Sequence, residues 1–270
     1  MREFFESEIK KWDLARENYV ALGKVLKKPF RAGELRGDVQ YNPARSVSTL
    51  AKVDKLSLEK RPCFLCASNR PDIQKSKEIL PGFELLINPF PILPYHFTIA
   101  SKNHTPQILD IATGKKLAEL LTGMVVFFNS EGAGASAPDH LHYQCVPLEQ
   151  LPLINLINEK KDKGETEITL PFKIIEDDSY TEKGKPLNAF FWKYGDEIRS
   201  IIIPRKAHRP KEYFLDFPAR RAVSPGAIDM AGVIVTPIRE DYEAIDEKDI
   251  INIYQQVAYP GNIEPNNEPE

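Results

Sequence analysis

Residues 139–144 read Asp-His-Leu-His-Tyr-Gln and place two of the chain's five histidines one residue apart. On a helix, side chains two positions apart point about 200° away from each other, so His140 and His142 would not share a site. On a strand they lie on one face, with the apolar residues between them on the other. We therefore predict an extended segment that carries a polar row of His140, His142 and Gln144.

A loop of small residues, 129–138, comes directly before this segment and contains two glycines. Glycine lets a backbone approach a ligand closely, and the N–H groups of such a loop can bind a phosphate lying over the polar row. The alternative interpretation is a pair of half-exposed histidines on an edge strand, with Gln144 in solvent.

The composition limits the kinds of partner. The chain of 270 residues is long enough for one large domain or two small ones, and its net charge of −3 creates no general attraction for nucleic acid or for an anionic membrane. Its first 20 residues lack the apolar core of a signal peptide. Apolar runs such as 124–128 are far shorter than the roughly 20 residues of a membrane-spanning helix. We expect a cytoplasmic protein.

Two of the three cysteines, Cys63 and Cys66, are separated by two residues. In a reducing compartment this spacing indicates a metal knuckle or a redox pair more than a structural disulfide. Zinc is usually held by four Cys or His ligands, so two more would be needed. The available histidines are His96, His104, His140, His142 and His208. The alternative is a reduced, buried or redox-active pair without metal.

Apolar periodicity predicts the main elements. We expect a helix within residues 2–26, two strands within 83–100 around a proline-rich turn, and a helix from a Thr113 cap to about residue 128. The charged segment 159–167 is typical of a solvated connector. In the second half, strand-like runs occur at 172–175, 188–194, 198–204 and 232–238. A helix is expected in the late 240s and 250s.

Several segments together resemble a known family. RPCFLCASNRP, LLINPF, SKNHTP and NSEGAGASAPDHLHYQ occur in the same order as in the galactose-1-phosphate uridylyltransferase branch of the histidine-triad superfamily. That branch also contains dinucleoside-polyphosphate phosphorylases and nucleoside-diphosphate-sugar phosphorylases. The stretches QYNPAR and MAGVIVTPIREDYEAI are more similar to GDP-hexose phosphorylases. The resemblance spans residues 40–245, and the H-x-H-x-Q segment with its loop is the most specific part.

The resemblance implies a metal site. In the uridylyltransferases both cysteines of the C-x-x-C, a histidine in a loop after the early strands, and the first histidine of H-x-H-x-Q bind zinc. The matching positions here are Cys63, Cys66, His104 and His140. Zinc would be structural, because four protein ligands leave no open position. The alternative interpretation of His104 is a histidine in a surface loop.

The resemblance also implies a nucleophile, His142, which takes the nucleoside monophosphate, while Gln144 holds the phosphate. A neutral imidazole can attack the α-phosphorus and form a phosphoramidate, which divides one difficult displacement into two easier ones. Gln144 can donate to a phosphate oxygen without adding charge. Asn129, Ser130 and Ser136 are further candidate donors to the phosphate.

Two other positions are candidates for substrate binding. Asn88 matches a family position near the nucleotide ribose, although an Asn before Pro also forms turns. Arg45 is a candidate cation for the phosphates, because guanidinium can bind two oxygens at once; the alternative is a surface arginine. Leu141 stands where the uridylyltransferases have proline. The phosphorylases also tend to lack this proline. No second H-x-H-x-Q follows in the later half, so we expect one active site per chain.

We therefore predict an α+β fold, an antiparallel sheet with packed helices made of two histidine-triad-like halves, the second degenerate. The predicted units are 1–158, the catalytic half with its N-terminal helix, 168–258, the second half, and 259–270, a disordered tail. The predicted function is a nucleotidyltransferase or phosphorylase that acts on a nucleoside-diphosphate sugar or a dinucleoside polyphosphate through nucleotidyl-histidine. Phosphate or a sugar phosphate would be the acceptor.

Two alternatives to this function remain at this point. One is a nucleotide hydrolase of the same superfamily, in which water is the second acceptor. The other is a non-catalytic nucleotide-binding module that has kept the cavity. A homodimer is also possible, and the sequence specifies neither the base nor the sugar of the substrate.

Overall fold

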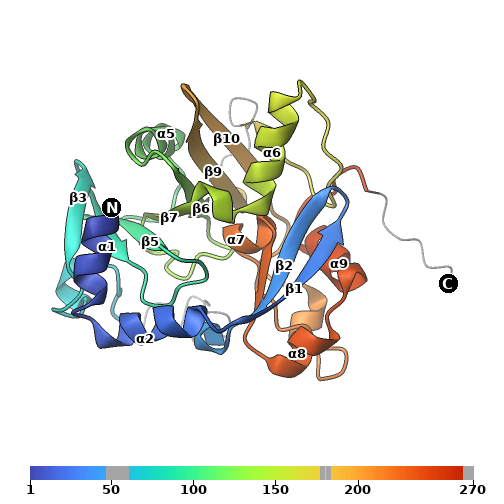
Figure 1. The fold of residues 1–270 in the computed structure, drawn as a ribbon, viewed down its shortest axis with the longest axis horizontal. Helices are drawn as coiled ribbons and strands as arrows, with labels where there is room; N and C mark the ends of the chain where they lie inside the picture. The colour runs from blue at the N-terminus through green and yellow to red at the C-terminus, as the bar shows by residue number, and fades with distance from the viewer. Residues whose placement is uncertain (47–60, 177–179, 181–183, 264–270) are drawn as a thin grey trace.

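A central antiparallel sheet organises the protein, whose computed structural model describes residues 1–46, 61–176, 180 and 184–263 (Figure 1). Its strands lie side by side in the order β3-β4-β5-β7-β6-β9-β10-β8. Their bounds are β3 Ser76–Leu80, β4 Phe83–Ile87, β5 Phe97–Ser101, β6 Met124–Asn129, β7 His142–Pro147, β8 Ile175–Glu176, β9 Leu187–Tyr194 and β10 Glu197–Pro204. The pairing of β6 with β9 joins the two halves of the chain into one sheet.

Both faces of this sheet are covered. Along β6, Val125 and Phe127 belong to one hydrophobic core, while Val126 and Phe128 belong to the other. A strand buried on both faces is apolar at every position instead of alternating. This burial explains why the run 124–128 is continuously apolar.

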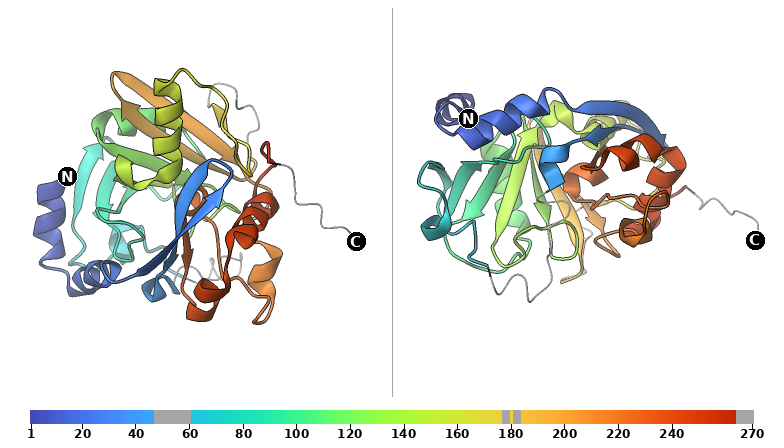
Figure 2. Two further views of the ribbon diagram at one scale, coloured as in Figure 1. Left: turned by 45° about the vertical axis from the view of Figure 1, so that its right-hand side comes forward. Right: turned by 90° about the horizontal axis from the view of Figure 1, so that it is seen from below.

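Helices and a second sheet cover the two faces (Figure 2). One face packs against α1 (Arg2–Ile9), α2 (Asp13–Leu22) and α5 (Ile111–Leu120). The helix α5 lies so close that a Cβ on Gly114 would be 2.6 Å from the Phe191 ring. The other face packs against elements that include α6 (Pro152–Asp162), α7 (Ala227–Met230) and α9 (Glu247–Val257).

The second sheet brings distant parts of the sequence together. It consists of β1 (Leu26–Ala32), β2 (Leu35–Tyr41) and β11 (Val233–Thr236), with β2 and β11 parallel. After β2 the chain continues this pairing, since the Asn42 N–H donates to the Thr236 carbonyl over 3.0 Å. The stretches QYNPAR and MAGVIVTPIREDYEAI are therefore neighbours in space, and α8 (Arg239–Ala244) follows β11.

The predicted α+β class with a large antiparallel sheet is confirmed. So are the two strands within 83–100, the later strands at 188–194, 198–204 and 232–238, and the helix in the 250s. The run predicted at 172–175 is wrong as a strand, because β8 begins only at Ile175 and Phe172 makes an isolated bridge to Pro260. In the part of the chain that the structure describes, no helix has the length and apolar character needed to cross a membrane. The division at residues 158 and 168 stays a prediction, and residues 264–270 of the predicted tail lie outside the described residues.

Three predicted boundaries are wrong. The helix predicted over 113–128 ends at Leu120, because the apolar residues after it form β6; its N-cap is Asp110, which accepts from the Ala112 N–H. The N-terminal helix is two helices, α1 and α2. The connector predicted at 159–167 is helical in its first part, because α6 continues to Asp162.

Candidate active site and metal centre

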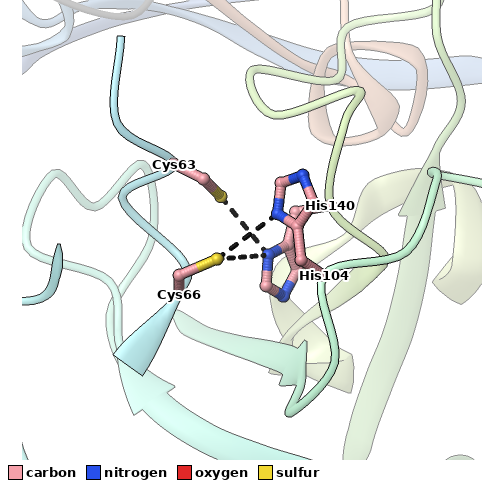
Figure 3. Close-up of side chains that lie close together, drawn as sticks. All are labelled: Cys63, Cys66, His104 and His140. Carbon is pink, nitrogen blue, oxygen red and sulfur yellow. Dashed lines mark hydrogen bonds between the residues drawn. The ribbon is translucent and has the colours of Figure 1, made fainter. Parts of the chain in front are cut away.

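Four side chains with soft or imidazole donors meet beside the large sheet (Figure 3). They are Cys63, Cys66, His104 and His140, and their donor atoms all lie within 4.8 Å of one another. The cysteines come from a tight turn after residue 60, His104 follows β5, and His140 precedes β7. Residues that are 77 positions apart in the chain are thus brought into contact.

The geometry of this cluster fits a tetrahedral metal ion. The Cys63 Sγ to His140 Nδ1 and Cys66 Sγ to His104 Nδ1 distances are both 3.3 Å, and Cys66 Sγ lies 3.6 Å from His140 Nδ1. Ligands bound to one tetrahedral zinc would be separated by about 3.5 Å, given usual Zn–S and Zn–N lengths. The His140 Nε2–H donates to the Ser101 carbonyl over 2.8 Å, which leaves Nδ1 as the ligand atom. These four residues could hold a metal ion.

His142 opens β7, and its ring is held in one tautomer. Its Nδ1 lies 2.8 Å from the carbonyl oxygen of His140, and since a carbonyl only accepts, Nδ1 carries the proton. The lone pair is therefore on Nε2. Burial lowers the pKa of His142 to about 4, so the ring is neutral at neutral pH. A buried, oriented, neutral imidazole is suited to nucleophilic attack.

Gln144 is oriented by His96, a histidine to which the sequence analysis assigns no specific role. The Ile92 N–H donates to Nδ1 of the buried His96, so His96 carries its proton on Nε2. That Nε2–H donates to Gln144 Oε1 over 2.8 Å. Because the amide oxygen is occupied, the NH₂ group of Gln144 is the end left to bind a ligand.

A cavity of about 550 Å³ lies in front of His142 and Gln144. Of the predicted substrate-binding residues, it is lined by Arg45, Asn88, Asn129 and Ser136. Further lining residues include the apolar Trp12, Phe64, Leu65, Leu86, Phe90, Ile92 and Phe127, and, from the second half, His208, Ser224 and Asp229. The structure therefore brings most of the predicted site residues to one cavity.

Two predicted residues are placed differently. Ser130 is not among the cavity residues, because its hydroxyl accepts from the Leu187 N–H over 2.7 Å and ties β6 to β9. His140 lies before β7, and its ring faces the cysteines while His142 and Gln144 face the cavity. The predicted polar row is thus limited to His142 and Gln144.

The remaining candidates have contacts of their own. Asn88 Oδ1 accepts from the Phe90 N–H over 3.0 Å, so it forms the turn and also lines the cavity. Arg45 donates to the Phe90 carbonyl, and burial lowers the pKa of its guanidinium to about 10, which still leaves the group charged at neutral pH. Asn129 Oδ1 accepts from Asn188 Nδ2 and from the Ala227 N–H. These bonds orient the Asn129 side chain.

Gln107 is a supporting residue that the sequence analysis missed. The pairing of β6 with β7 extends only to Phe127 opposite Gln144, and the backbones then separate. The Gln107 carboxamide bridges the gap: its Nε2 donates to the carbonyls of Asn129 and His142, and its Oε1 accepts from the His142 N–H. The buried carboxamide thus makes the hydrogen bonds to His142 that a neighbouring strand would otherwise make, and it fixes the backbone of His142.

Residues 4–147, more than half of the chain, match the family described as "Domain of unknown function (DUF4922)". The chain belongs to this DUF4922 family. No curated protein matches the chain.

Solved structures show the fold that this DUF4922 protein shares. It is similar to yeast Ap4A phosphorylase Apa2 in complex with AMP, with 16% identity and a TM-score of 0.58, covering 93% of this chain and 98% of that one. For the same yeast enzyme without a named ligand, the identity is 15% and the TM-score 0.58, covering 94% of this chain and 97% of that one. For its complex with Ap4A, the identity is 16% and the TM-score 0.59, covering 92% of this chain and 97% of that one. The resemblance inferred from the sequence is thus confirmed at the level of the fold.

We expect the purified protein to contain about one zinc ion per chain, because the four donors match a structural site. Elemental analysis after gel filtration measures this content. Cys66→Ala and His104→Ala should each lower the content, and chelation should lower the melting temperature. Cys145→Ala is the matched control, since Cys145 is a buried free cysteine of the core outside the cluster. Full zinc content in the Cys66 and His104 variants would exclude this site.

We expect Gln107→Leu to lower the free energy of unfolding by about 2 kcal/mol, because it leaves buried backbone groups of His142 and Asn129 without partners. Urea denaturation measures the change. In the control Asn155→Leu, which removes an exposed amide that donates to the Glu149 carbonyl, the change should stay within about 0.5 kcal/mol. Equal effects of the two substitutions would contradict the bridging role of Gln107.

Proposed function

We propose that this protein is a nucleotidyl-transferring phosphorylase that forms a covalent nucleotidyl-His142 intermediate. The observation that carries the proposal is the His142 ring, with Nδ1–H bound to the His140 carbonyl and its Nε2 lone pair left for the cavity that it lines beside Gln144. A neutral nucleophile and an oriented amide donor are the two groups that attack at a phosphorus atom requires.

In the first step His142 Nε2 attacks the α-phosphorus of the nucleotide. A P–N bond forms, the P–O bond to the leaving group breaks, and that bonding pair departs on the leaving-group oxygen. The ring becomes cationic, and its Nδ1–H stays bonded to the His140 carbonyl. In the second step an oxygen of inorganic phosphate attacks the same phosphorus, the P–N bond breaks, and a nucleoside diphosphate leaves with His142 neutral again.

The charges around the cavity suit this chemistry. Arg45 and Arg61 line it, and the Arg61 guanidinium lies 4.8 Å from the Phe64 ring and donates to the Ser136 carbonyl. The carboxylate of Asp229 also lines the cavity, but its two oxygens accept from the N–H groups of Gly226 and Val235. Fixed cations and amide donors stabilise the negative charge that shifts during transfer.

A dinucleoside polyphosphate is the favoured donor and inorganic phosphate the favoured acceptor. The support is the shared fold with an Ap4A phosphorylase that has been crystallised with AMP and with Ap4A. The apolar part of the cavity, which includes Trp12, Phe64 and Phe90, suits a nucleobase. A nucleoside-diphosphate sugar fits the same chemistry as an alternative donor.

We also propose that the metal at the cysteine and histidine cluster is zinc and that its role is structural. When bound, it supplies a link between three loops without an open coordination position. The residues themselves connect the cluster to the nucleophile, since the carbonyl of His140 accepts from His142 Nδ1. The cytoplasmic location and the homodimer remain predictions from the sequence.

We expect intact-protein mass spectrometry to show an adduct of one nucleoside monophosphate after incubation with a dinucleoside polyphosphate or with ADP-, GDP- or UDP-sugars, without phosphate. His142→Ala should form no adduct, because it lacks the nucleophile. Ser130→Ala, whose hydroxyl bonds to the Leu187 backbone, is the control that should still form one.

Added phosphate should release the adduct as a nucleoside diphosphate. Release as a nucleoside monophosphate at the same rate with or without phosphate would instead identify a hydrolase. Nucleotide binding without an adduct, without products and without any effect of His142→Ala would identify a binding module and contradict the proposed function.

A further inference from the structure

A second polar cluster lines the same cavity and is contributed by the other half of the chain. It consists of His208, Arg209 and Ser224, of which His208 and Ser224 are cavity-lining. Neither the nucleophile nor the phosphate donors proposed above require it. The hydrogen bonds within it nevertheless determine which group it offers to a ligand.

The hydrogen bonds of the cluster are compatible with a free donor on His208. Arg209 Nε–H donates to Ser224 Oγ over 3.0 Å, because guanidinium has no acceptor. Ser224 Oγ also lies 3.0 Å from His208 Nε2, and its hydroxyl can either donate to this nitrogen or accept from it. When Ser224 donates, His208 carries its own proton on Nδ1, and Nδ1–H has no hydrogen-bond partner among the residues that the structure describes. Burial lowers the pKa of this ring to about 4, so it stays neutral.

The cluster is held rigidly. Arg205, which is 1% exposed, donates to the carbonyl of His208, to that of Pro225, which follows Ser224, and to Asn188 Oδ1. Asn188 in turn donates to Asn129 Oδ1 on β6. The second-half wall is thus fixed relative to the strand next to His142, as a preorganised binding group requires.

The residues that line the cavity indicate which part of the substrate His208 and Ser224 bind. In an in-line displacement, the leaving group lies on the side of phosphorus opposite to the attacking atom, and the later acceptor arrives at the same place. The apolar wall suits the base, and Gln144 lies beside the nucleophile. The polar residues that the second half contributes to the lining are His208, Ser224 and Asp229, and both carboxylate oxygens of Asp229 already accept from backbone N–H groups.

We propose that His208, supported by Ser224 and Arg209, forms the subsite for the phosphate of the leaving group and of the acceptor. Its ligand class is a phosphate oxyanion, whether inorganic phosphate or the phosphate end of a nucleotide or sugar phosphate. The role rests on the proposed function for its place in the reaction, but the binding of phosphate can be measured without turnover. In this subsite, His208 Nδ1–H donates to a phosphate oxygen next to the positive charge of Arg209.

The test is isothermal titration calorimetry of inorganic phosphate into the full-length protein saturated with AMP, GMP or UMP, whichever binds the parent. His208→Phe keeps a ring but loses the donor, and Ser224→Ala removes the link to Arg209. Both should raise the Kd of phosphate by about tenfold or more, the usual effect of losing one hydrogen bond to a charged ligand. The Kd of the mononucleotide should change by less than about twofold.

Two further variants separate binding from folding. His208→Asn retains a donor near the position of Nδ1 and should restore part of the affinity that His208→Phe loses. Lys206→Ala removes a neighbouring exposed cation that donates to the Gln255 carbonyl, and it should leave the Kd of phosphate unchanged. Melting temperatures within a few degrees of the parent value would show that all variants are folded.

Phosphate binding that is absent in the parent, or equal in the parent and folded His208→Phe, would overturn the subsite. Failure of the proposed function would give a different result from failure of the subsite. A parent that forms no nucleotidyl-His142 but binds phosphate through His208 would retain the subsite and lose the covalent mechanism.

Discussion

The hydrogen bond from His142 Nδ1 to the carbonyl oxygen of His140 is the interaction on which the proposed chemistry of the cavity depends. It selects the tautomer, leaves the lone pair on Nε2 and can stabilise the ring when it becomes cationic. The acceptor is the backbone of a residue whose own side chain belongs to the cysteine and histidine cluster. A structural metal there would therefore act on His142, the proposed nucleophile, through a single residue and would not contact the substrate.

Buried amides and one arginine hold the strands of the first half and the second-half part of the cavity lining around this centre. Gln107 bridges the gap between β6 and β7, and Asn188 connects β9 to Asn129. Arg205 extends the network to the wall that carries His208. The second half, which lacks its own H-x-H-x-Q segment, thus contributes one wall of the cavity. The pairing of β6 with β9 explains why residues from both halves line this cavity.

Sequence patterns were informative where the chemistry is local. The strand at His142 and Gln144 followed from a period of two, and the cysteine spacing indicated the knuckle. The helix predicted through 124–128 was wrong, because burial of β6 on both faces removes the alternation that marks a strand. Gln107 and His96 were missed because their partners lie 35 and 48 positions away in the chain, where only the fold brings them together.

The most direct test of the covalent account is the stereochemistry at the α-phosphorus. A dinucleoside polyphosphate made chiral at that atom with sulfur and oxygen isotopes would be converted with phosphate, and the configuration of the nucleoside diphosphate determined by ³¹P NMR. Two successive in-line displacements, the first by His142, predict overall retention. Inversion would mean that phosphate attacks the substrate directly, and it would contradict the nucleotidyl-histidine mechanism.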